Sequence, residues 1–578
     1  MIKELMKCIG EYKKDSIRTP IFVVLEVIME VAIPFLMATM IDKGIEVGNM
    51  HVIVKVGVIL MAFAILALIF GVLSGLTAAK ASAGFAKNLR QKMYYRVQDY
   101  SFANIDKFST ASLVTRLTTD VTNLQNAYQM IIRVAVRCPI MLIFSLIMAF
   151  SINHKLAIIY VVIIPLLGFG LYKVASSAHP IFEKVFKTYD QLNNVVQENL
   201  RGIRVVKAFV REENEDEKFK DVSKVIYDRF TAAEKILAFN GPMMQTAVYT
   251  ALTLICWFAA KMIVVGDMTT GELVSLFSYT MQILISLMML SMVFVMIIIS
   301  RASAERIVEV IKEESDLKNG ENPITKIPDG SITFENVNFS YSKNPDKVCL
   351  KNINLTIPSG AMVGIIGGTG SSKSSLIQLI PRLYDATSGC VKVGGKDVRD
   401  YDIEALREEV AMVLQKNELF SGTINENLRW GNKEASDEEI VRVCQLAQAD
   451  EFVSKFPDAY ETYIEQGGTN VSGGQKQRLC IARALLKKPK ILILDDSTSA
   501  VDTKTDAMIR KAFRDEIPDT TKLIVAQRIS SIMEADMIIV MENGMISAVG
   551  THDELLQTNS IYQEVYYSQT KEAMTHEA

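Results

Sequence analysis

The first 300 residues contain apolar segments that are long enough to cross a lipid bilayer. A helix needs about 20 apolar residues, at about 1.5 Å per residue, to span the hydrocarbon layer. Two long polar stretches between these segments keep a helical apolar rhythm, which indicates helices that continue beyond the bilayer. The pattern predicts six spans, at approximately 20–41, 53–79, 128–151, 155–175, 238–264 and 273–300.

The second half of the chain has a different pattern. After residue 313 the sequence becomes polar and carries Gly320, Pro323 and Pro328, and short apolar runs typical of strands begin at Ile332. Composition shifts of this kind mark domain boundaries. We therefore expect a helical membrane domain at 1–315, a linker at 316–330 and an α/β domain at 331–578.

Composition supports this division. The 578 residues have a mean hydropathy of +0.21, yet 22% of them are charged, so the chain needs both a lipid-embedded and a soluble part. A net charge of −3 gives no reason to expect nucleic acid as a partner. The seven cysteines show no metal-binding spacing, and we interpret them as reduced, mostly buried side chains.

Charge along the first half predicts the orientation in the membrane. The two long polar stretches are rich in lysine and arginine, whereas the short links between spans hold few cations. Cytoplasmic loops of membrane proteins carry the excess of positive charge. We therefore expect the N-terminus, both long stretches and everything after residue 300 to be cytoplasmic.

Four charged residues fall inside or at the start of predicted spans. Glu26 and Glu30 lie on the first, and Arg133 and Arg137 begin the third. Each pair is spaced i, i+4 and therefore shares one helix face. Charge in hydrocarbon requires pairing or a water-filled cavity, so a structural salt bridge and a substrate-binding role both remain open.

A phosphate-binding loop is predicted near the start of the second half. The apolar run Met362–Ile366 reads as a buried strand and leads into a glycine- and serine-rich loop, after which 376–383 continues as a helix. Backbone N–H groups of such a loop hold phosphate oxygens, Lys373 reaches the outer phosphates, and the Ser374 hydroxyl binds Mg²⁺. The ATP-binding residues predicted here are Gly367, Gly370, Ser371, Ser372, Lys373, Ser374 and Ser375.

A second apolar strand, Ile491–Leu494, ends in Asp495. A carboxylate at this point, opposite a phosphate-binding loop, holds Mg²⁺ through water. About 120 residues separate the two motifs, so their joint occurrence by chance is improbable. ATP and Mg²⁺ are therefore the expected ligands.

Between these motifs the chain resembles ATP-binding-cassette transporters. The run Ser472-Gly473-Gly474-Gln475, followed by Lys476-Gln477-Arg478, is similar to their signature motif. The resemblance identifies Gln415 as the Q-loop residue, which also reaches Mg²⁺, Tyr341 as the adenine-stacking aromatic, and Ser499-Ala500-Val501-Asp502 as the D-loop. Residues 112–120 and 198–207 resemble the cytoplasmic loops of multidrug-type exporters. The resemblance implies six membrane spans fused to a nucleotide-binding domain, with two such halves in one transporter.

Three positions depart from the family pattern. Ser372 replaces the glycine before the lysine, and we expect its Cβ atom to strain a turn that glycine tolerates or to crowd the phosphates. Asp496 replaces the glutamate that polarises the attacking water, and Gln527 replaces the switch histidine. Aspartate is one methylene shorter, and a misplacement of roughly an ångström can cost on the order of 10²-fold in rate. Glutamine cannot become positively charged. We therefore expect an impaired hydrolytic site.

The resemblance then implies the degenerate half of a heterodimeric exporter. The signature residues Ser472, Gly473, Gly474 and Gln475 would complete a competent ATP site whose phosphate-binding loop belongs to a second, homologous half. The alternative is a low-activity cassette protein that acts as an ATP-sensing gate or as a homodimeric transporter. We expect a multi-pass protein of a bacterial plasma membrane, and the sequence does not reveal whether small molecules, lipids or peptides are its substrate.

Overall fold

The computed structural model describes residues 1–342, 344, 346–496 and 501–576. The chain divides into two compact units. Met1–Gln98 and Ser109–Glu313 form the first, and Asp99–Phe108 and Glu314–Ala578 form the second. The second unit therefore includes a ten-residue segment that comes from within the helical half of the chain.

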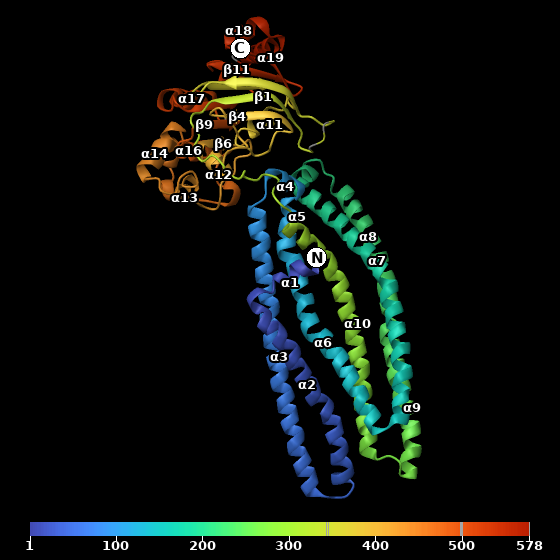
Figure 1. The fold of residues 1–578 in the computed structure, drawn as a ribbon. Coiled ribbons are helices and arrows are strands. Elements are labelled where there is room, and N and C mark those ends of the chain that lie inside the picture. Colours follow the sequence, from blue (N-terminus) through green and yellow to red (C-terminus); the bar gives the residue numbers. More distant parts are fainter. Residues whose placement is uncertain (343, 345, 497–500, 577–578) are drawn as a thin grey trace. The chain divides into compact units, whose positions relative to one another are not determined.

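The first unit is entirely helical (Figure 1). Within the described residues, six helical stretches are long and apolar enough to cross a membrane, which confirms the predicted six-span fold. They are Gly10–Ile45, Met50–Gln98, Thr110–Ile152, His154–Phe182, Glu212–Val265 and Thr270–Lys312. The α-helices are α1 (Ile2–Lys7), α2 (Lys13–Met40), α3 (Met50–Gln98), α5 (Thr110–Thr115), α6 (Val121–Ile152), α7 (His154–Ala208), α8 (Glu212–Leu237), α9 (Asn240–Val265) and α10 (Thr270–Lys312).

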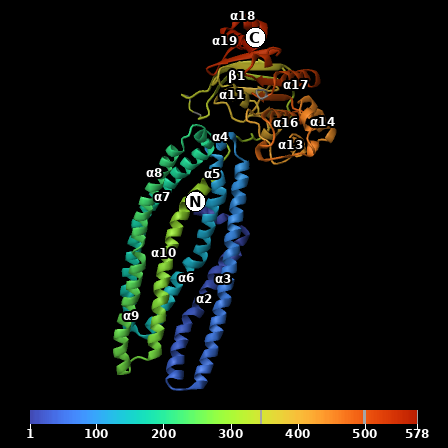
Figure 2. The same ribbon diagram turned by 180° about the vertical axis from the view of Figure 1, so that it is seen from behind.

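Several of these helices are much longer than a bilayer requires. Helix α3 has 49 residues and α7 has 55, which correspond to about 74 Å and about 83 Å at 1.5 Å per residue. Helix α8 lies beside the distal part of α7 (Figures 1 and 2). The polar stretches with helical rhythm are therefore extensions of the spanning helices, as expected.

A π-helical turn, Arg116–Asp120, joins α5 to α6 and carries two ion pairs to α10. The buried Asp120 carboxylate accepts a hydrogen bond of 2.7 Å from Arg306, and the Arg116 guanidinium lies 2.8 Å from Glu309. These contacts fasten the extension of the third span to the extension of the last. They belong to the 112–120 stretch that resembles a family loop.

The second unit contains a mainly parallel sheet with strand order β12-β11-β3-β10-β9-β6 and an antiparallel sheet with order β2-β1-β4-β5. Strands β3 and β9 are continuous apolar runs, as expected for strands buried on both faces. The strands are β1 (Ile332–Phe339), β2 (Leu350–Ile357), β3 (Met362–Gly367), β4 (Ser388–Val393), β5 (Lys396–Asp397), β6 (Val410–Val413), β7 (Gly422–Thr423), β8 (Tyr463–Ile464), β9 (Ile491–Asp495), β10 (Thr521–Val525), β11 (Met537–Glu542) and β12 (Met545–Gly550).

Helices and two apolar cores complete this unit, which is the predicted α/β fold. Helices α13 and α14 pack against α16 (Figure 2). The helices are α4 (Phe102–Lys107), α11 (Lys373–Gln378), α12 (Ile403–Glu409), α13 (Ile424–Leu428), α14 (Asp437–Leu446), α15 (Asp450–Val453), α16 (Gly473–Leu486), α17 (Thr503–Glu516), α18 (His552–Thr558) and α19 (Ser560–His576). In parallel sheets the carboxyl ends of the strands hold ligands. The ends of β3, β9 and β10 therefore define one candidate edge.

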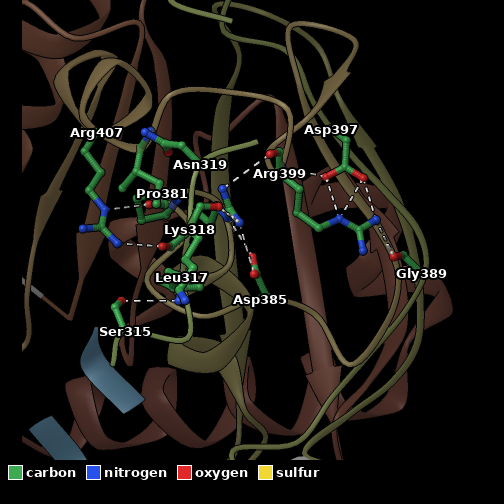
Figure 3. A network of polar contacts seen from close by, with 12 residues as sticks. Ser315, Leu317, Lys318, Asn319, Pro381, Asp385, Gly389, Asp397, Arg399 and Arg407 are labelled. Atoms are coloured by element: carbon green, nitrogen blue, oxygen red, sulfur yellow. Dashed lines mark hydrogen bonds and ion pairs between the residues drawn. The ribbon is translucent and has the colours of Figure 1, made fainter. Parts of the chain in front are cut away.

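The segment that follows α10 is fixed to the second unit by a polar network (Figure 3). The buried Arg382 guanidinium donates to the Lys318 carbonyl at 3.2 Å and to Asp385 at 2.8 Å. Arg407 donates to the Arg382 carbonyl at 2.7 Å, and Asn319 accepts from the backbone N–H of residue 403 at 3.0 Å. The start of the expected linker is therefore ordered structure.

Helix α4 packs into the same unit. The Phe102 ring contacts Tyr384 edge-on at 6.1 Å, and the Tyr384 hydroxyl donates to Asp106 at 2.6 Å. The Asn104 amide donates to the Glu314 carbonyl at 3.1 Å. These contacts explain why residues 99–108 cluster with the second unit although they sit between two membrane helices in sequence.

Candidate nucleotide-binding site

The predicted phosphate-binding loop connects β3 to α11. The Lys373 ammonium donates to the carbonyls of Gly367 and Gly368 at 2.8 and 2.9 Å and to the Ser371 hydroxyl at 3.3 Å. Burial lowers the pKa of Lys373, while Asp495 and Asp496 act in the opposite direction. The lysine therefore lies over its own loop, between the loop carbonyls and two carboxylates.

Ser372 adopts a left-handed backbone conformation, with φ at 70° and ψ at 28°. For an L-residue with a Cβ atom this conformation costs roughly 1–2 kcal/mol, whereas glycine adopts it freely. Gly370, two residues earlier, also has a positive φ of 82°. The structure thus contains the backbone strain that the serine at position 372 predicts.

The end of β9 lies next to this loop. The Ser374 hydroxyl donates to the Asp495 carboxylate at 3.0 Å. Burial raises the pKa of Asp495, while the Ser374 hydrogen bond acts against that shift. A hydroxyl and a carboxylate at this distance are the oxygen ligands that Mg²⁺ prefers, so the pair fits the metal of a nucleotide complex.

Asp496 lies at the centre of a cluster of amides. Its carboxylate accepts a hydrogen bond of 2.7 Å from the Gln527 amide, and its backbone φ is 50°. Burial raises the pKa of Asp496, whereas hydrogen bonds from Gln527 and Gln415 lower it. The structure thus brings together Asp496, Gln527 and Gln415, the residues predicted at the base, switch and Q-loop positions.

Tyr341 lies beside the first turns of α11. Its hydroxyl lies 2.9 Å from the Ser375 hydroxyl and donates to Gln378 at 3.1 Å. Tyr341 is 45% exposed, and its ring packs edge-on against Tyr384. An aromatic residue therefore lies partly exposed close to the phosphate-binding loop, and its stacking on adenine stays a prediction.

The signature residues form the N-terminus of α16. The Ser472 hydroxyl accepts from the Gln475 backbone N–H at 3.3 Å, and the Gln475 side chain accepts from the Ser472 N–H at 2.9 Å, which makes a capping box. Ser472 and Gly473 are exposed. Helix N-termini bind anions, so this surface can meet a phosphate held by another molecule.

The D-loop is only partly visible, since Ser499 and Ala500 lie outside the described residues. Asp502, at its end, caps α17 through a bond of 2.9 Å from the Thr505 N–H. Two further residues contact the site: Gln477, which belongs to the run that resembles the signature motif, and Gln569, which no motif indicates. The buried Gln477 amide donates to the Asp496 carbonyl at 3.4 Å, and Gln569 of α19 contacts the backbone around residue 527. Only three-dimensional packing reveals Gln569.

In the first unit, three of the four predicted charges come together. The Arg137 guanidinium pairs with both Glu26 and Glu30, the latter at 2.7 Å. The Ser74 hydroxyl also donates to Glu26 at 3.2 Å. Arg133 has no ion pair among the described residues, and its guanidinium lies beside Gly75 of α3. One cation thus serves two carboxylates between α2 and α6.

Comparison with known proteins agrees with this geometry. Residues 18–288 match the family described as ABC transporter transmembrane region, and residues 350–499 match the family described as ABC transporter. The uncharacterized ABC transporter ATP-binding protein YfiB of Bacillus subtilis (strain 168) is 35% identical over 98% of both chains. The putative multidrug export ATP-binding/permease protein YgaD of the same organism is 30% identical over 98% of this chain and 99% of its own.

A solved structure shares the fold. The structure of a bacterial Atm1-family ABC exporter with ATP bound has a TM-score of 0.84 to this chain, covers 96% of it and 99% of its own length, and is 23% identical in sequence. Structural similarity at this sequence identity shows only a shared fold, whereas the two relatives from Bacillus subtilis show membership of the family. The chain, with six membrane-spanning helices fused to an α/β ATPase-type domain, therefore belongs to the ABC transporter family.

Proposed function

We propose that this chain is the degenerate-site half of a heterodimeric ABC exporter that moves a substrate out of the cytoplasm. The exporter fold, the fusion of membrane and cassette units, and a relative named as a putative multidrug export protein support the direction of transport. The partner is a second, homologous half that carries glutamate and histidine at the positions of Asp496 and Gln527. The complex lies in a bacterial plasma membrane with the cassettes in the cytoplasm.

The arrangement of Asp496 and Gln527 carries this proposal. A general base must accept a proton or hydrogen bond from the attacking water within about 3 Å. The Asp496 carboxylate instead accepts from the Gln527 amide at 2.7 Å, and its side chain is shorter than glutamate. The amide of Gln527 stays neutral and cannot stabilise phosphate charge as a cationic histidine would. Hydrolysis at this site is therefore slow.

Binding of nucleotide is retained. Lys373, Ser374 and Asp495 have the geometry to hold a triphosphate and Mg²⁺, and Tyr341 presents a ring for the base. A site that binds but hydrolyses slowly stabilises the closed pair of cassettes for as long as ATP stays bound. In the complex, binding of a labelled ATP analogue should be lost in Lys373→Ala when the partner's site is blocked.

Restoring the degenerate positions tests the proposal. In a complex whose partner has lost its own catalytic glutamate, the combined change Ser372→Gly, Asp496→Glu and Gln527→His should raise ATP turnover about 10²-fold. Ser372→Gly alone, which leaves the base and switch positions unchanged, should have little effect on turnover. Equal turnover in the restored and unaltered chains would contradict the proposal.

The alternative functions differ in their partners. An ATP-sensing gate or a homodimeric transporter would purify with copies of itself, whereas a heterodimer half co-purifies with a distinct homologous chain. No feature of the described residues favours the gate. The substrate, whether a small molecule, lipid or peptide, would bind among side chains from both halves.

A further inference from the structure

A side chain from the C-terminal helix α19 contacts the loop that follows β10. We call this loop, residues 526–531, the switch loop because it contains Gln527. The Gln569 amide nitrogen donates to the Gln527 carbonyl at 2.8 Å, and its oxygen accepts from the Ile529 N–H at 2.9 Å. One side chain thus makes two hydrogen bonds to the residues on either side of Arg528. We call this pair of hydrogen bonds the clip. A primary amide pairs well with two backbone groups because it has a donor and an acceptor side by side.

The position of Gln569 follows from the docking of its helix. Tyr562 is fully buried in the core of the second unit, and its hydroxyl lies 2.7 Å from His552 of α18. Tyr566 packs partly buried against the same core. Residues 562, 566 and 569 share one helix face, because positions three and four apart lie above one another. The buried tyrosines therefore aim Gln569 at the loop after β10.

The loop needs this partner. Ile529 begins a short 3₁₀ helix whose N-cap residue, Arg528, makes no side-chain hydrogen bond to it. Ile529 itself is 2% exposed, so its N–H depends on Gln569. On the other side, the Ser531 hydroxyl donates to Asp506 of α17 at 2.9 Å. The loop is therefore held at Ser531 by α17 and at its beginning by α19.

Gln527 connects this clip to the chemistry of the site. Its backbone carbonyl accepts from Gln569, and its side chain donates to the Asp496 carboxylate at 2.7 Å. A residue fixed at the backbone loses less freedom when its side chain binds. Release of the clip would leave the Gln527 backbone free to move and the contact with Asp496 less populated.

We propose that Gln569 is a positioning residue for the switch loop, through which the C-terminal helix sets how long ATP remains in this site. The inference rests on the proposed function for the role of Gln527 near the terminal phosphate. Nothing in the cassette motifs points to α19. The consequence is that changes at the C-terminus of the chain alter nucleotide retention without touching any cassette motif.

Amide hydrogen exchange tests the clip itself. In the full-length complex without nucleotide, Gln569→Met keeps the size of the side chain but removes both hydrogen bonds. Exchange of the backbone at 526–531 should become at least about fivefold faster, as expected for the loss of even one of the two bonds at ordinary strength. Gln563→Met is the matched control, because Gln563 lies on the same helix and donates to the Leu556 carbonyl of α18 at 2.7 Å. Unchanged exchange in Gln569→Met would overturn the proposal.

Nucleotide retention tests the positioning role. With the partner's site blocked, Gln569→Met should shorten the lifetime of a bound, labelled non-hydrolysable ATP analogue with Mg²⁺ about fivefold, and Gln563→Met should leave it unchanged. In a Gln527→Ala background Gln569→Met should add nothing, because it acts through Gln527. Faster exchange with an unchanged lifetime, or additive effects of the two substitutions, would overturn the proposal. If the unaltered complex retains no analogue, the proposed retention of ATP at this site is wrong. The exchange result alone then decides whether Gln569 holds the loop.

Discussion

At the scale of single residues, the nucleotide site combines retained binding groups with strained or shortened ones. Lys373 donates to a carbonyl of its own loop and the Ser374 hydroxyl bonds to Asp495, and these are the groups that we propose hold magnesium nucleotide. Ser372 and Asp496, by contrast, both have positive φ values, at 70° and 50°. Strain of this kind concentrates at functional sites. Two of the three positions that depart from the family pattern therefore have a left-handed backbone conformation.

Ser372→Gly should stabilise the phosphate-binding loop. Removal of the Cβ atom relieves a left-handed conformation, and we expect a gain of about 1 kcal/mol in the free energy of unfolding, with tighter binding of an ATP analogue. Thermal unfolding and analogue titration measure both. Ser372→Ala is the control, because it removes the hydroxyl but keeps the Cβ atom. An equal gain in the alanine variant would show that the hydroxyl, and not the backbone, is responsible.

Lowering the pH should weaken magnesium-dependent ATP binding. The weakening should begin at a higher pH than it would with an aspartate of ordinary pKa. Burial raises the pKa of Asp495, so this carboxylate takes up its proton at a higher pH than a free aspartate, and its neutral form cannot hold the metal's water. Affinity should therefore fall as the pH is lowered from 7 to 5.

Asp495→Asn provides the reference for this titration. Its affinity should be low throughout, and the ratio of the unaltered chain to this variant cancels the titration of the nucleotide itself. A ratio that stays constant over this range would mean that Asp495 keeps an ordinary pKa.

The sequence predicts the roles of some of these residues and not of others. Ser372 could be recognised as strained because the loop pattern requires glycine at that point, and the structure has the expected left-handed backbone. The proximity of Ser374 to Asp495 follows from the strands β3 and β9 of one parallel sheet, whose carboxyl ends lie at the same edge with β10 between them. Gln569 could not be predicted, since its partners are backbone groups about 40 residues away and any amide on a helix looks alike in sequence.

At the scale of elements, α16 presents a capped N-terminus to the surface. The capping box fixes Ser472 and Gln475, and the adjoining glycines leave room for another molecule to approach the helix dipole. Under the proposed function, this N-terminus meets a phosphate that another subunit holds. The proposed role of the signature is therefore separate from that of the chain's own base.

Ser472→Arg or Gly473→Asp should abolish ATP hydrolysis by the complex and stop transport. The bulky or acidic side chain would block or repel the phosphate bound by the partner. Steady-state ATPase and transport assays measure the effect. Gly320→Asp is a suitable control, because a side chain there meets no atom within 4 Å. Normal turnover in both signature variants would show that the signature does not serve the partner's site.

The charges in the membrane unit form a bridge between α2 and α6. Arg137→Ala should lower the free energy of unfolding by about 2 kcal/mol, because it leaves Glu26 and Glu30 without their cation. This loss is smaller than the loss for a fully buried ion pair, since the Arg137 side chain is 32% exposed. Glu26→Gln with Glu30→Gln should recover part of the loss.

Arg133→Ala is the matched control for this bridge and should leave stability almost unchanged. Thermal melts of the detergent-solubilised complex measure all variants, and transport of a cationic and a neutral substrate accompanies them. Unchanged melting with altered preference for the cation would mean that the carboxylates line the transport pathway instead.

The helices differ in how far the sequence predicts their position and packing. The spanning helices follow from long apolar runs, and their extensions follow from helical rhythm in polar sequence. The inclusion of α4 in the second unit could not be predicted, because it depends on the contact of Phe102 with Tyr384 and on the bond from Tyr384 to Asp106. Six residues of helix carry too little pattern to reveal a tertiary partner.

At the scale of the whole molecule, the chain carries one complete set of cassette motifs, which departs from the family pattern at three positions. Under the proposed function, its phosphate-binding loop and base belong to a slow site, while its signature is intact. Such a chain would reach full activity only when another chain supplies a competent base. Two unlike ATP sites, one that holds nucleotide and one that hydrolyses it, follow from this proposal.

Steady-state ATPase activity of the purified chain, measured alone and together with its homologous partner, tests this account most directly. We predict weak turnover for the chain alone and robust turnover for the complex, and Asp496→Asn should leave most of the activity of the complex, because hydrolysis takes place at the partner's site. A turnover of the isolated chain equal to that of the complex, abolished by Asp496→Asn, would contradict the account.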